Sequence, residues 1–269
     1  MWTATVIQGS TGLRWKYPDM RIFKSHRGFT LVEMMIGVFL STVLISGIVQ
    51  LLGGSVSAYR MQLSQSQLEE SGRYARDALV THISQAGFQP EPWQTPAGFQ
   101  ALTDESLNGA SSSSDQLGLQ RWSQHNCYGN ENSVKDSYGQ PAFYLLQTRF
   151  TVNKSNNLSI TCRYGAEISS LSTQMNNFGL IEDVESMQIL YAEDRDGDEI
   201  ADSWVTAQSW LKESNIQAVK VALLLSTRQA FDQAAATQIT LLDESITPPA
   251  DGHLRRIKSS TTAIRGRLK

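Results

Sequence analysis

The sequence predicts an α+β fold in which one long N-terminal helix, apolar in its first half and amphipathic in its second, packs on an antiparallel β-sheet. The run from Phe29 to Leu52 has 24 residues and one charge, Glu33. As a helix with a rise of ~1.5 Å per residue it would be roughly 36 Å long, enough to cross a hydrocarbon core of ~30 Å. Helical spacing continues to about Ala86, and short alternating segments follow it.

The flanks of this apolar run predict its orientation and its role. Basic residues precede it: Arg21, Lys24 and Arg27. By the positive-inside rule the N-terminus stays cytoplasmic and the chain after Leu52 is exported. A secretory signal carries a small-residue cleavage site after its apolar core, whereas here Gly28 precedes the run. A charge inside a membrane helix costs on the order of 2.5–3.5 kcal/mol, so Glu33 needs a partner or a function. The alternative is an uncleaved anchor helix with a stray Glu33.

The segment after Gly53-Gly54 has the spacing of an amphipathic helix. Its expected apolar positions are Val56, Tyr59, Leu63, Ala75, Ala78, Leu79 and Ile83. Gly53 and Gly54 each disfavour the helix by ~1 kcal/mol relative to Ala, and Gly87 is its expected stop. We therefore expect one helix with a membrane half and a half that packs on a globular domain. A coiled-coil stalk would need a sustained heptad, which this segment lacks.

Alternating and apolar segments after Gly87 predict the antiparallel sheet. They are residues 117–122, 142–152, 158–164, 180–191 and 216–227, with 254–257 and 261–268 at the end. A polar, turn-rich stretch, 126–139, separates the first two. The two cysteines, Cys127 and Cys162, both fall on the exported side, where an isolated pair predicts one disulfide. The alternative is two buried free thiols.

Charge and motifs limit the classes of function. Residues 1–28 hold five Lys/Arg and one Asp, which leaves 18 basic and 25 acidic residues, a net charge of −7, after Gly28. An acidic exported part is not a general nucleic-acid binder. A local basic patch stays possible at the end of the chain, where we note Arg255, Arg256, Lys258, Arg265, Arg267 and Lys269. No phosphate-binding loop, dinucleotide fingerprint, nucleophile elbow or histidine metal spacing occurs, so we expect no catalytic residues and no enzyme.

An acidic stretch is a candidate Ca²⁺ loop. Asp194, Asp196, Asp198 and Asp202 occupy relative positions 1, 3, 5 and 9, and Ile200 at position 7 would contribute its carbonyl. Position 6, where such loops have Gly, is Glu199, and position 12, where they have Glu, is Val205. A full EF-hand is therefore not expected. The alternative is a solvated, metal-free acidic turn.

The residues around the glycine resemble a known processing site. Gly28-Phe29-Thr30-Leu31-Val32-Glu33 is similar to the cleavage site of type IV prepilins and pseudopilins. The resemblance implies that a membrane peptidase cuts after Gly28 and methylates the new amino terminus at Phe29. It also implies that Glu33 pairs with the N-terminal amine of a neighbouring subunit, which would supply the partner that membrane energetics requires.

Later segments resemble the PilW family of minor pilins. They are Val184–Tyr191 with Asp194–Asp198, Ser71–Ala75, Gln85–Phe88, Leu254–Ile257 and Thr261–Arg265. The resemblance implies a pilin-like fold and a place in the tip or priming complex of a type IV pilus, which supports motility, adhesion or DNA uptake indirectly. The implied partners are other minor and major pilins, the prepilin peptidase, the inner-membrane assembly machinery and the membrane. The alternatives are a pilus-tip adhesin or DNA-binding module and a type II secretion minor pseudopilin.

These expectations divide the chain into four parts. Residues 1–28 are a leader, within which 1–19 are a candidate gene-model extension with Met20 as the start. Residues 29–52 are the transmembrane and assembly helix, 53–87 its amphipathic continuation, and 88–269 a globular β-rich domain. The expected location is the inner membrane, single-pass with the carboxyl-terminal domain in the periplasm, and then the pilus.

Overall fold

The structure is a computed structural model of the chain and describes residues 28–91, 98–109, 113–231 and 237–267, apart from the side chain of Arg267. The expected leader up to residue 27 lies outside the described residues. The chain divides into two compact units, Met1–Val56 and Ser57–Lys269. We call the second of these the globular unit.

A single helix, α1, extends from Leu31 to Gln85 and is not interrupted at Gly53 or Gly54. After it the chain turns, and Gly87 has a φ of 77°, the left-handed conformation that glycine adopts without steric cost. The large apolar side chains between Leu31 and Leu52 are exposed. Among the described residues, α1 is the one helix long and apolar enough to cross a membrane.

The buried face of α1 begins later than the sequence pattern predicts. Its buried residues are Ser64, Leu68, Gly72, Ala75, Leu79 and Ile83. Val56, Tyr59 and Leu63, which we expected on this face, are 49%, 65% and 47% exposed, because the strands cover the helix only from Ser64 onward. The spacing of the buried set, three to four residues, is that of one helix face against a core.

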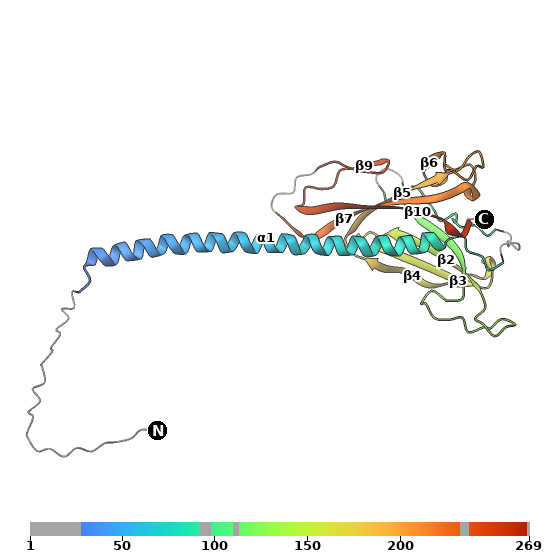
Figure 1. Cartoon of the computed structure of the whole chain (residues 1–269), viewed down its shortest axis with the longest axis horizontal. Coiled ribbons are helices and arrows are strands. Elements are labelled where there is room, and N and C mark those ends of the chain that lie inside the picture. Colours follow the sequence, from blue (N-terminus) through green and yellow to red (C-terminus); the bar gives the residue numbers. More distant parts are fainter. Residues whose placement is uncertain (1–27, 92–97, 110–112, 232–236, 268–269) are drawn as a thin grey trace, which may run out of the picture. The chain divides into compact units, whose positions relative to one another are not determined.

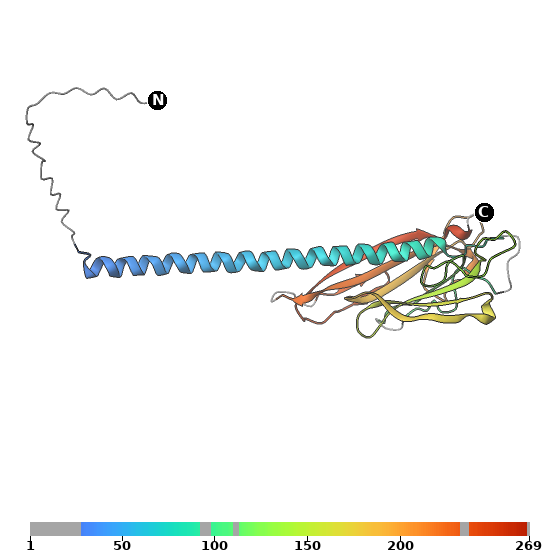
Figure 2. The same cartoon turned by 90° about the horizontal axis from the view of Figure 1, so that it is seen from below.

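Two four-stranded antiparallel sheets lie beside this part of α1 (Figures 1 and 2). The first has the order β1-β2-β3-β4, formed by Leu117–Ser123, Tyr144–Val152, Leu158–Gly165 and Ser172–Ile181. The second has the order β10-β7-β5-β6, formed by His253–Ala263, Ile216–Ala230, Val184–Glu193 and Ser203–Val205. A small hairpin pairs β8, Ile239–Leu241, with β9, Glu244–Ile246. Three 3-10 turns complete the described elements: η1 Ile168–Ser170, η2 Glu213–Asn215 and η3 Arg265–Arg267.

The helix and both sheets share one hydrophobic core. Leu79 and Ile83 from α1, Phe150 from β2 and Tyr191 from β5 are all at most 1% exposed. Asp115, just before β1, ties the first sheet to the second: its Oδ2 accepts a hydrogen bond from the Ile189 amide at 2.7 Å. Burial raises the pKa of Asp115 to about 6, although two backbone hydrogen bonds oppose the shift.

Three features of the strands differ from the expectation. The segment 180–191 is not one strand, because a turn at Glu182-Asp183 separates β4 from β5, and Asp183 has a φ of 64°. β4 is mostly exposed and has no buried alternation that could predict it. The two expected terminal segments are joined in β10, which ends at Ala263, and η3 follows it.

Candidate functional site

The start of α1 holds Glu33 in a defined position. Thr30 precedes the helix as its N-cap, and its Oγ1 accepts a hydrogen bond from the Glu33 amide at 3.2 Å. In return, the Glu33 Oε2 accepts a hydrogen bond from the Thr30 amide at 3.5 Å. This reciprocal pair is a capping box, which satisfies two amides that the first helical turn leaves without partners. The carboxylate of Glu33 is therefore held beside the residue that cleavage after Gly28 would make the amino terminus, Phe29.

Sequence reasoning missed the role of Thr30. The pattern Ser/Thr-x-x-Glu before an apolar run is a known helix-start signal, and Thr30-x-x-Glu33 matches it. The signal was present in the sequence, but the same residues belong to the predicted processing site, which already explained them. Thr30 is a positioning residue, because it touches the side chain that is expected to meet the partner.

Two hydroxyl groups of the apolar run form hydrogen bonds within the helix. Ser41 donates to the Gly37 carbonyl at 2.6 Å, and Thr42 donates to the Phe39 carbonyl at 2.8 Å. On hydrocarbon transfer scales, a hydroxyl group without a hydrogen-bond partner costs several kcal/mol in an apolar medium. These bonds therefore suit a helix surrounded by lipid or by other apolar helices. Glu33 is the one ionisable side chain of this run.

The structure joins Cys127 and Cys162 by a disulfide, the pairing that the sequence predicts. Cys162 is buried in β3, and Cys127 lies in the loop after β1. Two hydrogen bonds to Gln174 of β4 also hold this loop: the Cys127 amide donates to its side chain at 3.2 Å, and the Tyr128 hydroxyl donates to its carbonyl at 2.6 Å. The bond therefore secures the polar loop between β1 and β2 to the sheet.

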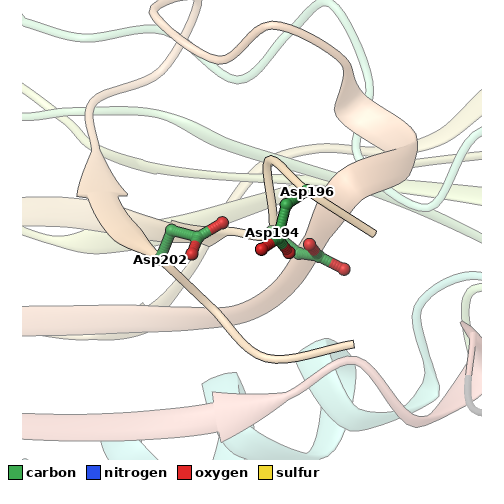
Figure 3. Close-up of side chains that lie close together, drawn as sticks. All are labelled: Asp194, Asp196 and Asp202. Carbon is green, nitrogen blue, oxygen red and sulfur yellow. The ribbon is translucent and has the colours of Figure 1, made fainter. Parts of the chain in front are cut away.

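The acidic stretch forms the connection between β5 and β6. Carboxylate oxygens of Asp194, Asp196 and Asp202 lie within 4.8 Å of one another (Figure 3). Among the described residues this group does not include Asp198, whose Oδ1 accepts a hydrogen bond from the Ile200 amide at 2.8 Å. The structure thus brings together three of the four carboxylates expected at a Ca²⁺ loop.

Backbone amides already stabilise this acidic loop. Both carboxylate oxygens of Asp194 accept hydrogen bonds, from Gly197 at 2.7 Å and from Glu199 at 3.0 Å, and these bonds hold the pKa of Asp194 below its usual value. The pKa of Asp196 is raised: the amide of Asp198 lowers it, but the negative charges of the neighbouring carboxylates outweigh that effect. A bound Ca²⁺ stays a prediction.

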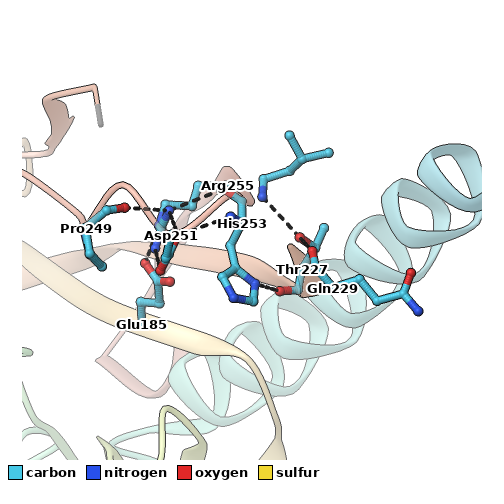
Figure 4. A network of polar contacts seen from close by, with 8 residues as sticks. Glu185, Thr227, Gln229, Pro249, Asp251, His253 and Arg255 are labelled. Carbon is cyan, nitrogen blue, oxygen red and sulfur yellow. Dashed lines mark hydrogen bonds and ion pairs between the residues drawn. The ribbon is translucent and has the colours of Figure 1, made fainter. Parts of the chain in front are cut away.

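Two cations of the expected basic patch at the end of the chain are paired with carboxylates. Arg255 lies between Glu185 and Asp251, with N–O distances of 2.7 and 2.8 Å (Figure 4). Its guanidinium holds the pKa of Asp251 well below the usual range, and Lys258 pairs with Glu69 of α1. Lys269 lies outside the described residues. The nucleic-acid alternative, which needs these cations free for phosphate, is therefore weakened.

The histidine positions indicate packing contacts. His82 is partly buried on α1, where its ring lies 5.1 Å from that of Phe150 in an edge-on contact. Burial, and then the positive charge of Arg121, lowers the pKa of His82 to about 4, so the ring is neutral at pH 7. His253 contacts the main-chain carbonyl of Thr227. His26 lies outside the described residues.

Comparisons with known proteins bear on both ends of the chain. The model of the prokaryotic N-terminal methylation motif matches residues 23–49. The model of Type IV Pilus-assembly protein W, PilW, matches residues 149–266. No curated protein matches the chain significantly. A solved structure that matches is a type IV-like pilin from Thermus thermophilus, with 20% identity and a TM-score of 0.48, over 75% of this chain and 97% of that one; a likeness at this level supports no inference about function.

The two family matches support general conclusions about the function of the chain. The methylation motif and the apolar helix indicate anchoring in a membrane and association with a pilus. Both matches indicate a structural protein that contacts other pilins and the assembly machinery. The resemblance drawn from the residues is thereby confirmed: the chain combines a prepilin-type N-terminal methylation motif with a PilW-type carboxyl-terminal segment, and this combination supports the role of a minor pilin in type IV pilus assembly.

Proposed function

We propose that the chain acts in a tip or priming complex of a type IV pilus, where its helix packs with those of other minor pilins. The observation that supports this role best is the start of α1, where Glu33 is held by Thr30 at the head of an exposed apolar helix. An isolated carboxylate at that depth is costly in lipid. A neighbouring subunit that brings a positive charge to Glu33 removes the cost, so the membrane itself favours assembly.

The positive charge comes from processing. Cleavage after Gly28 by the prepilin peptidase frees the amine of Phe29, which is then methylated and keeps its positive charge. In the bundle, the amine of one subunit meets Glu33 of the next, and the exposed apolar side chains of the helices pack together. The carboxylate makes the contact directional, because only one register places it opposite an amine.

The orientation of the chain in the membrane follows from the basic residues before the apolar run. The amino terminus stays on the cytoplasmic side and the globular unit, Ser57–Lys269, stands in the periplasm before it enters the pilus at the cell surface. The inner-membrane assembly machinery supplies the remaining partners. Motility, adhesion and DNA uptake follow indirectly from the pilus. The family that matches residues 149–266 is named for pilus assembly, which favours this role over a secretion pseudopilin.

The role is tested by the amino terminus and by piliation in the same cells. Mass spectrometry of the membrane-extracted protein should find N-methylated Phe29 as the first residue, and Gly28→Val should leave the leader attached. Deletion of the gene should reduce surface pili and leave type II secretion unchanged. An intact leader in peptidase-competent cells, or lost secretion with normal piliation, contradicts the proposal.

A further inference from the structure

A groove of about 390 Å³ lies on the globular unit where α1 ends. It is lined by Ser84, Gln85, Phe88, Arg121, Trp122, Ser123, Gln124, His125, Phe143, Arg265 and Gly266. The rings of Phe88 and Phe143 lie 6.1 Å apart, and Phe88 is 43% exposed. None of the described lining residues is acidic. The groove therefore combines aromatic walls with cationic side chains.

The walls of the groove are held by backbone contacts. The Gly87 amide donates to the Gln120 carbonyl at 2.8 Å, and the Trp122 amide donates to the Phe88 carbonyl at 2.9 Å, so the chain after α1 is bonded to β1. On the other side, Gly266 lies so close to the end of α1 that a Cβ there would come within 2.4 Å of the Ala86 carbonyl oxygen. The groove is thus preformed by rigid elements.

Two guanidinium groups in this groove lack counter-ions. In the part of the chain that the structure describes, no carboxylate pairs with Arg121 or Arg265, and the Nε of Arg121 is buried without a hydrogen-bond partner. Burial lowers the pKa of Arg121, which records the desolvation of its charge. By contrast, ion pairs engage Lys135, Arg149, Arg163, Arg195, Arg228, Arg255 and Lys258.

We propose that this groove binds an acidic peptide segment of a partner protein, with a carboxylate at Arg121 and Arg265 and apolar side chains against the rings of Phe88, Phe143 and Trp122. Guanidinium groups bind carboxylates through paired N–H donors, and such a bond would satisfy the buried Nε of Arg121. The volume accommodates a few side chains. A polyanion such as nucleic acid is disfavoured more strongly than a short peptide with one carboxylate, because repulsion from the net charge of −7 after Gly28 grows with the charge of the ligand.

The test is a binding titration with two peptides that differ in one carboxylate. Acetyl-Phe-Glu-Phe-amide and acetyl-Phe-Gln-Phe-amide are titrated into the full chain in nonionic detergent by calorimetry, and inorganic phosphate and a thymidine oligonucleotide are further probes. The glutamate peptide should bind at least about tenfold more tightly than the glutamine peptide. Higher salt should weaken its binding. These measurements need no pilus, so their outcome is independent of the assembly role.

Variants locate the binding in the groove. Arg265→Gln should weaken binding of the glutamate peptide by about tenfold, and Arg121→Gln should do the same. Arg256→Gln is the matched control, because Arg256 is exposed and lies outside the lining set, and it should leave the affinity unchanged. Arg265 is also exposed, so its variant should fold normally. Equal affinity for the two peptides, an unchanged Arg265 variant, or tighter binding of phosphate or the oligonucleotide overturns the proposal.

Discussion

Removal of the disulfide between Cys127 and Cys162 should destabilise the globular unit by an amount that can be worked from the structure. The two cysteines are separated by 35 residues. The chain-entropy relation gives about 4 kcal/mol at 25 °C for a loop of this length. The figure is an upper value, because unfolded chains in general retain some local structure. For a unit of this size, such a loss lowers the melting temperature by roughly 8–16 °C.

The assay is urea unfolding of the full chain in detergent, followed by tryptophan fluorescence. The variant Cys127→Ala/Cys162→Ala avoids a buried hydroxyl at Cys162, which is 2% exposed. Reductant added to the wild type is the matched control: it should reproduce the loss and leave the variant unchanged. Quantitative labelling of both thiols in unreduced, denatured protein, or a loss under about 1 kcal/mol, would refute the reasoning.

Three further predictions concern assembly, metal binding and pH. Glu33→Ala should insert in the membrane, because it removes a charge, but should lower the number of surface pili; normal piliation by electron microscopy would count against the pairing. Calorimetry with Ca²⁺ should show binding that Asp196→Ala/Asp198→Ala abolishes; no heat and no change in melting temperature at millimolar Ca²⁺ would identify a metal-free loop. His82 has a folded pKa of about 4, below its unfolded value of 6.5, so its neutral form contributes stability above pH 6.5 that is lost as pH falls toward 4. Unfolding free energies measured across this window should fall by on the order of 3 kcal/mol from this group, and an equal fall in His82→Leu would exclude it as the source.

The fold class and several strands could be predicted because their burial patterns are visible in the sequence. The apolar segments that became β1, β2, β3 and β7 have alternating or continuous buried residues, and α1 has one apolar run and one stop. β4 could not be predicted, because its polar sequence is exposed on both faces. The turn at Asp183 was hidden for another reason: a non-glycine residue at positive φ has no reliable sequence signal.

The candidate sites differ in how much of each could be predicted from the sequence. Glu33 was identifiable because a single charge stands in an apolar run, and its contact with Thr30 is local in sequence. The disulfide was identifiable because two cysteines allow one pairing. The groove was not, because Arg121 and Arg265 are far apart in the chain and only the tertiary fold brings both into the lining of one groove. Likewise, the pairing of Arg255 with Glu185, which neutralises one charge of an apparently basic end, depends on strand register.

The position of η3 against the end of α1 has a consequence for the order of folding. Gly266 touches the backbone at Ala86, Ile264 is buried in the shared core, and β10 pairs with β7 over most of its length. The first and last elements of the globular unit therefore complete the same core, and these contacts have large sequence separation, which slows folding. If the globular unit is exported as proposed, it cannot close while its final residues are still crossing the membrane. In that proposed orientation, the face of α1 that packs on the core stays exposed until export is finished, and periplasmic chaperones and proteases can reach it.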